Sequence, residues 1–235
     1  MKVKGIYMEL FDIFKKKKQP ENKGPMYLYS DQELVEFDAY VEKCLGYYDF
    51  VFHEIASPDI HLDVITIPPT EEHPFHKLVT MGAGAYEMNV PEQLKEQGFG
   101  HAEYVIFLPS DWNINSGDEK DYWPTRTLKM MGRLPIYEDS WLGFGHTIQA
   151  DEDGSSYAEN TGFNCTMLVS AVNFNGERMR LKLSSGKIIN FYQLIPIYPE
   201  ELAYKQANHA EALLDLLLEQ EGFPVVDIHR KSVIR

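Results

Sequence analysis

The side chains of this 235-residue chain that are best suited to chemistry are histidines close to acidic residues. His61 and Asp63 stand two residues apart in a strand-like run, so the alternation of a β-strand places both side chains on one face. There the carboxylate could orient the imidazole, or both groups could ligate a metal ion. His146 lies further along the chain, in a glycine-rich turn. These three residues define one interpretation of the chain, a small hydrolase or metalloprotein.

The spacing of the histidines favours a different interpretation. A dedicated metal site usually needs three or four converging ligands, whereas the sequence offers only pairs, such as His61 with Asp63 and His73 with His76. A buried hydrogen bond with a structural role is the commoner explanation for a His–Asp pair. We therefore expect no metal, no cofactor and no enzymatic activity.

Two other kinds of motif are also weak signals for catalysis. Cys165 lies in an apolar, strand-like run, where a thiol is typically inert core material. The segments Gly82–Gly84 and Gly143–Gly145 contain two glycines each, but they lack the GxxxxGK and GxGxxG patterns of phosphate-binding loops. The sequence therefore implies no nucleotide.

The three tryptophans are better candidates for a binding surface. Each stands beside a predicted loop or helix start, where aromatic anchors often form hot spots, although such rings also plug the ends of a core. After Trp141, glycines would let a partner's backbone approach closely, and His146 and Thr147 offer polar specificity. A purely structural turn is the equal alternative there. The predicted surface consists of Trp112, Trp123, Trp141, Gly145, His146 and Thr147.

Three helices are predicted to position these residues. Ser30 and Glu33 form a capping-box pattern at the start of the first helix, and Pro124 is assigned to the first turn of the second, where a proline is tolerated. The third has a broad leucine-rich face. The helices are expected near residues 31–45, 123–135 and 199–221.

Strand-like runs separate these helices. Asn175-Gly176 and Ser185-Gly186 supply hairpin turns, and residues 224–228 could add a final edge strand. The run at residues 75–81 has polar residues at alternate positions, which makes it a candidate exposed edge for strand addition by a peptide. We expect an α+β fold with a mixed, largely antiparallel sheet, built from residues 50–55, 60–67, 75–81, 102–108, 163–172, 178–183 and 188–197.

Charge and composition exclude some partners. The chain has 22 Lys and Arg residues against 36 Asp and Glu residues, a formal net charge of -14. Most of its surface should therefore repel the phosphates of a nucleic acid, which we do not expect as a partner. An acidic body would speed the encounter with a basic protein, although acidity also simply keeps a protein soluble.

The first 25 residues differ from the rest of the chain. We interpret residues 1–25 as a basic leader and linker and residues 26–235 as one folded domain. The amphipathic run at residues 8–14 is very short for a membrane-surface helix, and no stretch approaches the ~20 apolar residues of a membrane span. The two cysteines, Cys44 and Cys165, fit a reducing compartment. We expect a cytoplasmic protein without membrane contact.

Several segments, in unbroken order, carry a resemblance to a known family. They are His61–Val64 with Pro68-Pro69, Leu108–Trp112, Trp123-Pro124 with Leu128-Lys129, Trp141–Thr147 and Asn190–Leu202, and the tail Val225–Asp227 with Arg230 matches as well. On these residues the chain resembles the suppressor-of-fused domain from about residue 30 to residue 230. Residues 1–25 have no counterpart in that domain.

This resemblance implies a protein-binding function. The animal namesake of the family sequesters a Hedgehog-pathway transcription factor by clasping an extended peptide, and bacterial relatives are thought to act as immunity proteins beside polymorphic toxins. The chain is similar to the bacterial single-domain form and lacks the additional C-terminal domain of the animal protein, so the two-domain clasp is not implied. We expect a non-enzymatic, immunity-type protein that binds a cognate bacterial toxin, for which a basic toxin is one option.

Overall fold

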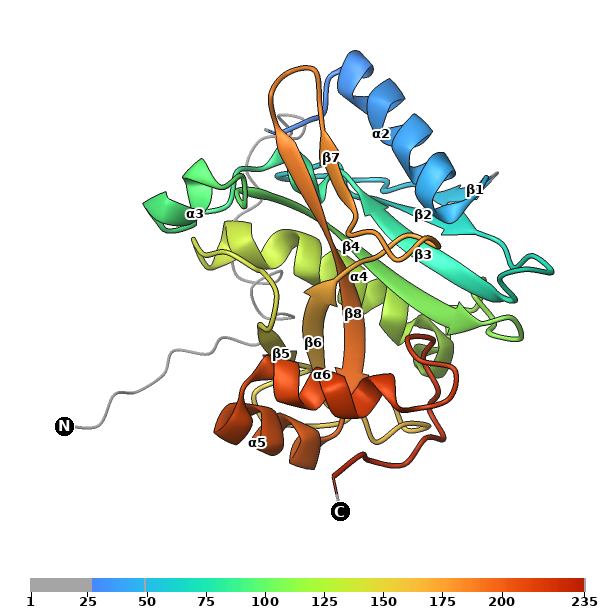
Figure 1. Cartoon of the computed structure of the whole chain (residues 1–235). Coiled ribbons are helices and arrows are strands. Elements are labelled where there is room, and N and C mark those ends of the chain that lie inside the picture. Colours follow the sequence, from blue (N-terminus) through green and yellow to red (C-terminus); the bar gives the residue numbers. More distant parts are fainter. Residues whose placement is uncertain (1–26, 49, 235) are drawn as a thin grey trace.

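The computed structural model describes residues 27–48 and 50–234 (Figure 1). The predicted leader at residues 1–25, including its amphipathic run, lies outside them, so the division into leader and domain stays a prediction. No helix among the described residues is long and apolar enough to cross a membrane.

The described residues contain an eight-stranded sheet with the order β1-β2-β3-β4-β8-β6-β5, and β7 also pairs with β8. Strands β4 and β8 are parallel, and the other strand pairs of the described part are antiparallel. The predicted mixed, largely antiparallel sheet is therefore confirmed. The strands are β1 (Phe50–Phe52), β2 (Asp63–Ile67), β3 (Phe75–Met81), β4 (His101–Pro109), β5 (Thr147–Gln149), β6 (Cys165–Ser170), β7 (Arg180–Lys182) and β8 (Ile188–Ile197).

Helices cover both faces of this sheet because alternate residues of its strands are apolar on both sides. In β2, for example, Val64 packs toward α4 and Ile65 toward α2. Helix α6 covers β6 and β8 at the other end of the sheet, where Leu213 and Leu217 enter the core. Figure 1 shows α2 and α4 on opposite faces. The helices are α2 (Asp31–Leu45), α3 (Glu92–Glu96), α4 (Glu119–Tyr137), α5 (Pro199–Asn208) and α6 (Ala210–Leu218), with a 3₁₀ turn at Ala83–Ala85.

The first predicted helix is confirmed, but the start of the second is wrong. Helix α4 begins at Glu119 because the side chain of Asp118 accepts a hydrogen bond from the backbone N–H of Lys120. Pro124 is thus the sixth residue of the helix and lies inside it. The Lys120 carbonyl, which would normally accept from residue 124, accepts instead from Asn160 Nδ2 at 3.1 Å.

The third predicted helix is two helices. His209 has φ 75 and interrupts the run, so α5 ends at Asn208 and α6 begins at Ala210. Its N–H closes α5 on the carbonyl of Lys205 at 2.7 Å, and its Nδ1 accepts from the N–H of Ala212 at 3.4 Å. A leucine pattern that continues through residue 209 cannot reveal this break, because the apolar stripe is the same on both sides of it.

The predicted edge strand at residues 75–81 is also wrong. Strand β3 pairs with β2 on one side and β4 on the other, and its Lys77 and Thr80 are buried. The strand order ends instead at β1 and β5. Residues 224–228 form no strand, although Val225 makes one parallel bridge to Phe107 of β4.

Candidate functional site

Two of the three tryptophans pack where the core ends. Trp123 is fully buried and stacks on Tyr157, with ring centroids 4.9 Å apart, so it is removed from the predicted surface. Trp112 meets the edge of Trp123 at 6.0 Å, and its Nε1 donates to the carbonyl of Asp121 at 2.9 Å. That carbonyl lies in the first turn of α4. Trp112 therefore anchors the loop before α4, and any contact of its half-buried ring with a partner stays a prediction.

The other predicted surface residues gather in the loop between α4 and β5. The rings of Trp141 and His146 lie 4.3 Å apart. The N–H of Gly145 donates to the carbonyl of Leu168, and the N–H of Leu168 donates back to the carbonyl of His146, at 2.8 and 2.9 Å. The loop is therefore tied to β6, and Thr147 starts β5 directly after it.

Both glycines of this loop are required by the fold itself. A Cβ at Gly143 would lie 2.7 Å from the Trp141 ring, so Trp141 can lie over the backbone only because residue 143 has no side chain. Gly145 has φ +79 and would bring a Cβ within 3.0 Å of Ala210. A structural role for this turn thus accounts for both glycines. His146 and Thr147 are half-buried in the structure.

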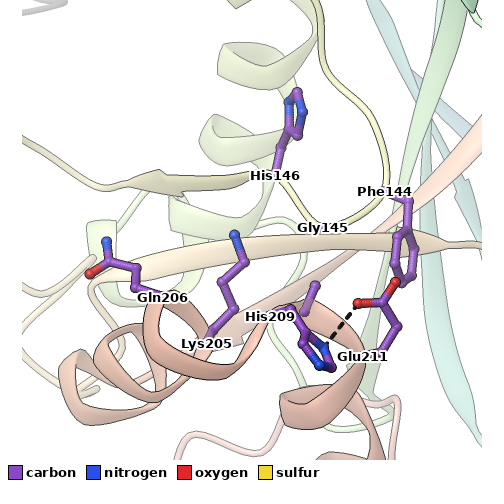
Figure 2. A pocket seen from close by; sticks show the side chains of 8 residues that line it. Phe144, Gly145, His146, Lys205, Gln206, His209 and Glu211 are labelled. Atoms are coloured by element: carbon purple, nitrogen blue, oxygen red, sulfur yellow. Dashed lines mark ion pairs between the residues drawn. The ribbon is translucent and has the colours of Figure 1, made fainter.

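A hollow of about 520 Å³ lies between this loop and the junction of α5 and α6 (Figure 2). In Figure 2 the side chain of Lys205 rises from α5 toward the loop before β5, whereas the ring of His146 points away from the two helices. His209 pairs with Glu211 at 3.3 Å. Burial, and then the charge of Lys205, lower the pKa of His146 below its usual range. The imidazole is therefore neutral near pH 7, and its N–H is used by the backbone carbonyl of Trp141, which leaves one nitrogen as an acceptor. The lining residues are Phe144, Gly145, His146, Lys205, Gln206, His209, Ala210 and Glu211.

The hollow adjoins an open edge of the sheet. Strand β5 ends the strand order, so one side of its backbone pairs with no described strand. Ala150 donates to Asn164 and Leu168 donates to His146, which places even-numbered positions of this segment toward β6. The N–H groups of Thr147 and Gln149 consequently point away from β6. A strand edge without a partner strand is a template for an incoming strand.

The residues of the enzyme alternative do not converge as the sequence suggested. His146 packs on Trp141, whereas His61 and Asp63 contact each other and His53. His53 was missed as a site residue. The pairing of β1 with β2 would have predicted it. Phe52 faces Val64, so the next pair on the hairpin is His53 with Asp63. Cys165 is an inert thiol, since burial raises its pKa to about 12.

Comparison with known proteins shows where this architecture recurs. The chain is 24% identical over 226 residues to an uncharacterized protein, UU111, of Ureaplasma parvum serovar 3, a match that covers 89% of this chain and 99% of that protein. The structure of this chain resembles a crystal structure described as a suppressor-of-fused homologue from Neisseria gonorrhoeae FA 1090. The TM-score is 0.59 at 18% identity, and the match covers 87% of this chain and 98% of the other.

Two further structures have the same fold. One is from the crystal structure of a Sufu–Fu complex, with a TM-score of 0.61, 12% identity, and coverage of 86% of this chain and 91% of the other. The other is Drosophila Suppressor of Fused, with a TM-score of 0.52, 12% identity, and coverage of 73% of this chain and 42% of that protein. The family model for suppressor of fused protein matches residues 58–231. The chain therefore belongs to the suppressor of fused protein family.

Proposed function

We propose that this chain is a non-enzymatic protein-binding module that holds an extended segment of its partner along β5. The observation that carries the proposal is the open edge of β5 beside a hollow of about 520 Å³. A protein of the same fold has been crystallised as a Sufu–Fu complex, which supports the choice of a protein as ligand.

The two features have different tasks in this proposal. The outward N–H groups of Thr147 and Gln149 give main-chain hydrogen bonds to the partner strand, which supply affinity for any sequence. The hollow selects a side chain, because the neutral His146 and the charged Lys205 and Glu211 lie at its wall. Trp141 supports this wall by packing against His146.

We further propose that the partner is a basic toxin and that the chain acts as its immunity protein in the cytoplasm. One support is the net charge of -14, which favours encounter with a positively charged protein. A second support is the resemblance to bacterial single-domain members of the family. In this role the chain neutralises the toxin by occupying its surface, and it needs no catalytic group of its own.

The first test is capture of the partner by the tagged chain from the source cells, followed by reconstitution with the purified partner. Trp141→Ala and His146→Ala should abolish or strongly weaken the complex. Tyr47→Ala is the matched control, because this exposed aromatic lies before β1 at the other end of the strand order. Inhibition of a toxic activity of the partner by the wild-type chain would support the immunity role, and a captured partner without such activity would refute it.

A second pair of variants tests strand addition. Gln149→Pro removes an outward N–H and leaves the ladder to β6 intact, whereas Gln149→Ala keeps that N–H. We expect Gln149→Pro to lose binding and Gln149→Ala to retain it. Equal binding by the two variants would show that the partner does not pair with the β5 edge.

A further inference from the structure

Three side chains that can ligate a metal meet at the β1–β2 hairpin. His53 Nδ1 lies 2.8 Å from one carboxylate oxygen of Asp63, and His61 Nε2 lies 3.2 Å from the other. The three ligand atoms are all within 4.8 Å of one another. Asp63 is only 3% exposed, while His53 and His61 are 72% and 41% exposed, so the cluster has a buried floor and an open side.

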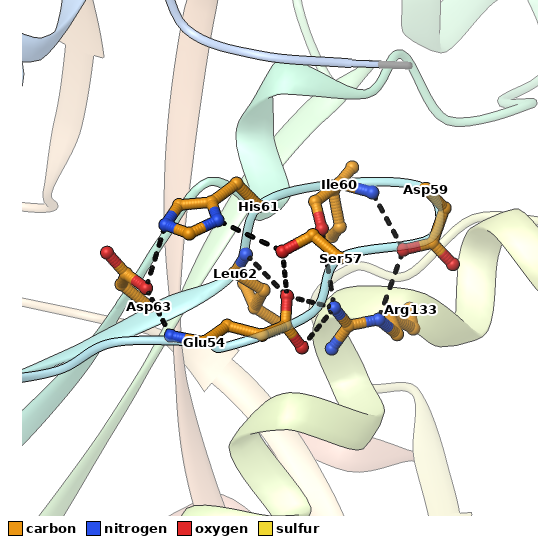
Figure 3. Close-up of polar contacts among 8 residues, drawn as sticks. All are labelled: Glu54, Ser57, Asp59, Ile60, His61, Leu62, Asp63 and Arg133. Atoms are coloured by element: carbon orange, nitrogen blue, oxygen red, sulfur yellow. Dashed lines mark hydrogen bonds and ion pairs between the residues drawn. The ribbon is translucent and has the colours of Figure 1, made fainter. Parts of the chain in front are cut away.

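The hydrogen bonds around His61 determine which of its nitrogens carries the proton. Ser57 Oγ donates its one proton to Glu54 Oε2 at 2.7 Å and lies 3.0 Å from His61 Nδ1 (Figure 3). Because that hydroxyl proton is already used, Ser57 must accept from an N–H at Nδ1. Nδ1 of His61 is thus engaged by Ser57, and Nε2 is the nitrogen that faces Asp63.

The residues behind Ser57 hold this arrangement in place. Arg133 contacts both carboxylate oxygens of Glu54 at 2.6 Å, and Arg133 Nε also donates to Asp59 at 3.1 Å. Glu54 in turn donates its backbone N–H to Asp63 at 2.9 Å. The Glu54 carboxylate is therefore fixed by a largely buried guanidinium while it accepts from Ser57.

His61 Nε2 and His53 Nδ1 approach the carboxylate of Asp63 from two sides, each nearest a different oxygen. Two imidazole nitrogens and one carboxylate then surround one point.

We propose that His53, His61 and Asp63 bind one divalent transition-metal ion of the zinc class. Tetrahedral coordination at Zn–N distances of about 2.1 Å separates neighbouring ligand atoms by about 3.4 Å. The His61–Asp63 separation of 3.2 Å is near this value, and the His53–Asp63 separation of 2.8 Å would have to widen slightly. Two imidazoles favour zinc, nickel or copper over calcium or magnesium. The His61–Ser57 and Glu54–Asp63 hydrogen bonds supply the outer contacts that orient metal ligands.

The site differs from the enzyme alternative considered for the sequence, since His53 takes the place of His146. Three protein ligands leave coordination positions on the open side, where water or a donor atom of a bound protein can enter. The site does not depend on the proposed function, because it lies beside β1 while the β5 edge lies at the other end of the strand order.

The test is a metal titration of the untagged, full-length chain. We expect one Zn²⁺ per chain by calorimetry, and Co²⁺ should give the visible d–d absorption of a site with bound nitrogen ligands. His53→Gln, at an exposed position that should not affect folding, and His61→Gln should lower Zn²⁺ affinity at least about tenfold. His229→Gln, which changes an exposed histidine outside the cluster, should bind as the wild type does.

A further variant examines the positioning role of Ser57. Ser57→Ala keeps all three ligands but removes the acceptor for His61 Nδ1–H, so the affinity should fall by about 10–100-fold while the cobalt spectrum keeps its shape. The absence of stoichiometric Zn²⁺ or Co²⁺ binding would overturn the proposal. So would binding that survives His53→Gln unchanged, because the ion would then lie elsewhere.

Discussion

Glu103 is a buried acid in β4 that accepts hydrogen bonds, and none of the described residues forms an ion pair with it. Tyr29 Oη and the N–H groups of Gly82 and Gly84 donate to one carboxylate oxygen at 2.8 to 2.9 Å, and Thr80 Oγ1 donates to the other at 2.5 Å. Loss of hydration is the largest influence and raises the pKa of Glu103 to about 7, although the four hydrogen bonds oppose the shift. The proton that it holds is consequently linked to stability.

This linkage predicts a pH dependence. The folded pKa of about 7 is above the ordinary 4.5, so the folded state keeps a proton that the unfolded state releases. The contribution of Glu103 is therefore greatest below pH 4.5 and falls by about 3 kcal/mol as the pH rises to 7. Glu103→Gln should remove this loss. Urea unfolding at pH 5 and 7.5 measures the free energy of unfolding of both proteins. An equal change with pH in the wild type and in Glu103→Gln would contradict the prediction.

At the scale of single residues, the sequence predicts which neighbouring side chains share a face, but it does not predict which distant residues join them. His61 and Asp63 do face the same way, as their spacing predicts, but His53, which follows β1, also contacts Asp63 from the neighbouring arm of the hairpin. Glu103 gave no signal, because one acid in an apolar run does not say which donors surround it. The fully buried Trp123 shows the reverse case, since residue type alone cannot separate a core aromatic from a binding anchor.

At the scale of elements, one ion pair attaches the C-terminal segment to α5. Arg230 donates from both terminal nitrogens to Glu201, at 2.6 and 2.7 Å, and its guanidinium lies over the rings of Phe163 and Tyr198 at 4.8 and 4.9 Å. Glu201 is fully buried and also accepts from the backbone N–H groups of Tyr198 and Val233. Removal of Arg230 would leave that carboxylate buried without its cation.

We expect Arg230→Ala to lower the free energy of unfolding by about 3–5 kcal/mol. Arg230→Lys should recover only part of this loss, because a lysine cannot form the bidentate pair or stack on the two rings. Lys120→Ala, which breaks a pair with the exposed Asp118, is the control and should cost less than about 1 kcal/mol. Chemical denaturation measures all three, and an Arg230→Ala cost as small as the control would refute the argument.

The junction of α5 and α6 stores strain next to the proposed binding site. His209 has φ 75 and ψ 168, a region that side chains with a Cβ rarely adopt, and it lines the hollow. We expect His209→Gly to stabilise the fold by about 1 kcal/mol, since relief of strain outweighs loss of a 3.4 Å cap.

Ala207→Gly, two residues earlier and inside α5, is the matched control for that substitution. It should destabilise by about 1 kcal/mol, because glycine there only adds freedom to the unfolded chain. Thermal unfolding of both variants checks the signs. Destabilisation by His209→Gly equal to that of the control would mean that the histidine contacts outweigh the strain, and that the break in the helix is held by His209 itself.

At the scale of the whole molecule, local patterns predicted the sheet but not its order. The hairpin between β7 and β8 follows from Ser185-Gly186, and the Leu183 N–H indeed bonds to the Lys187 carbonyl at 2.9 Å. The parallel pairing of β4 with β8 joins His101 to Ile189, far apart in the chain, and no local pattern reports it. The same limitation explains why the alternation at residues 75–81 wrongly predicts an edge strand. Exposure of an edge depends on partners that lie elsewhere in the sequence.

The net charge of -14 also belongs to the whole molecule, and it predicts how the partner arrives. If the partner is basic, long-range attraction speeds association, and salt screens that attraction. The association rate should fall about tenfold or more between about 50 and about 500 mM salt, where the screening length shrinks severalfold.

The local contacts at β5 act at a different step. Trp141→Ala removes packing beside the hollow and leaves the net charge unchanged, so it should raise the dissociation rate and preserve both the association rate and its salt dependence. Stopped-flow mixing with the purified partner separates the two rates. An association rate that does not change with salt would show that the partner is not basic, and the toxin proposal would lose its electrostatic support while strand addition at β5 could still hold.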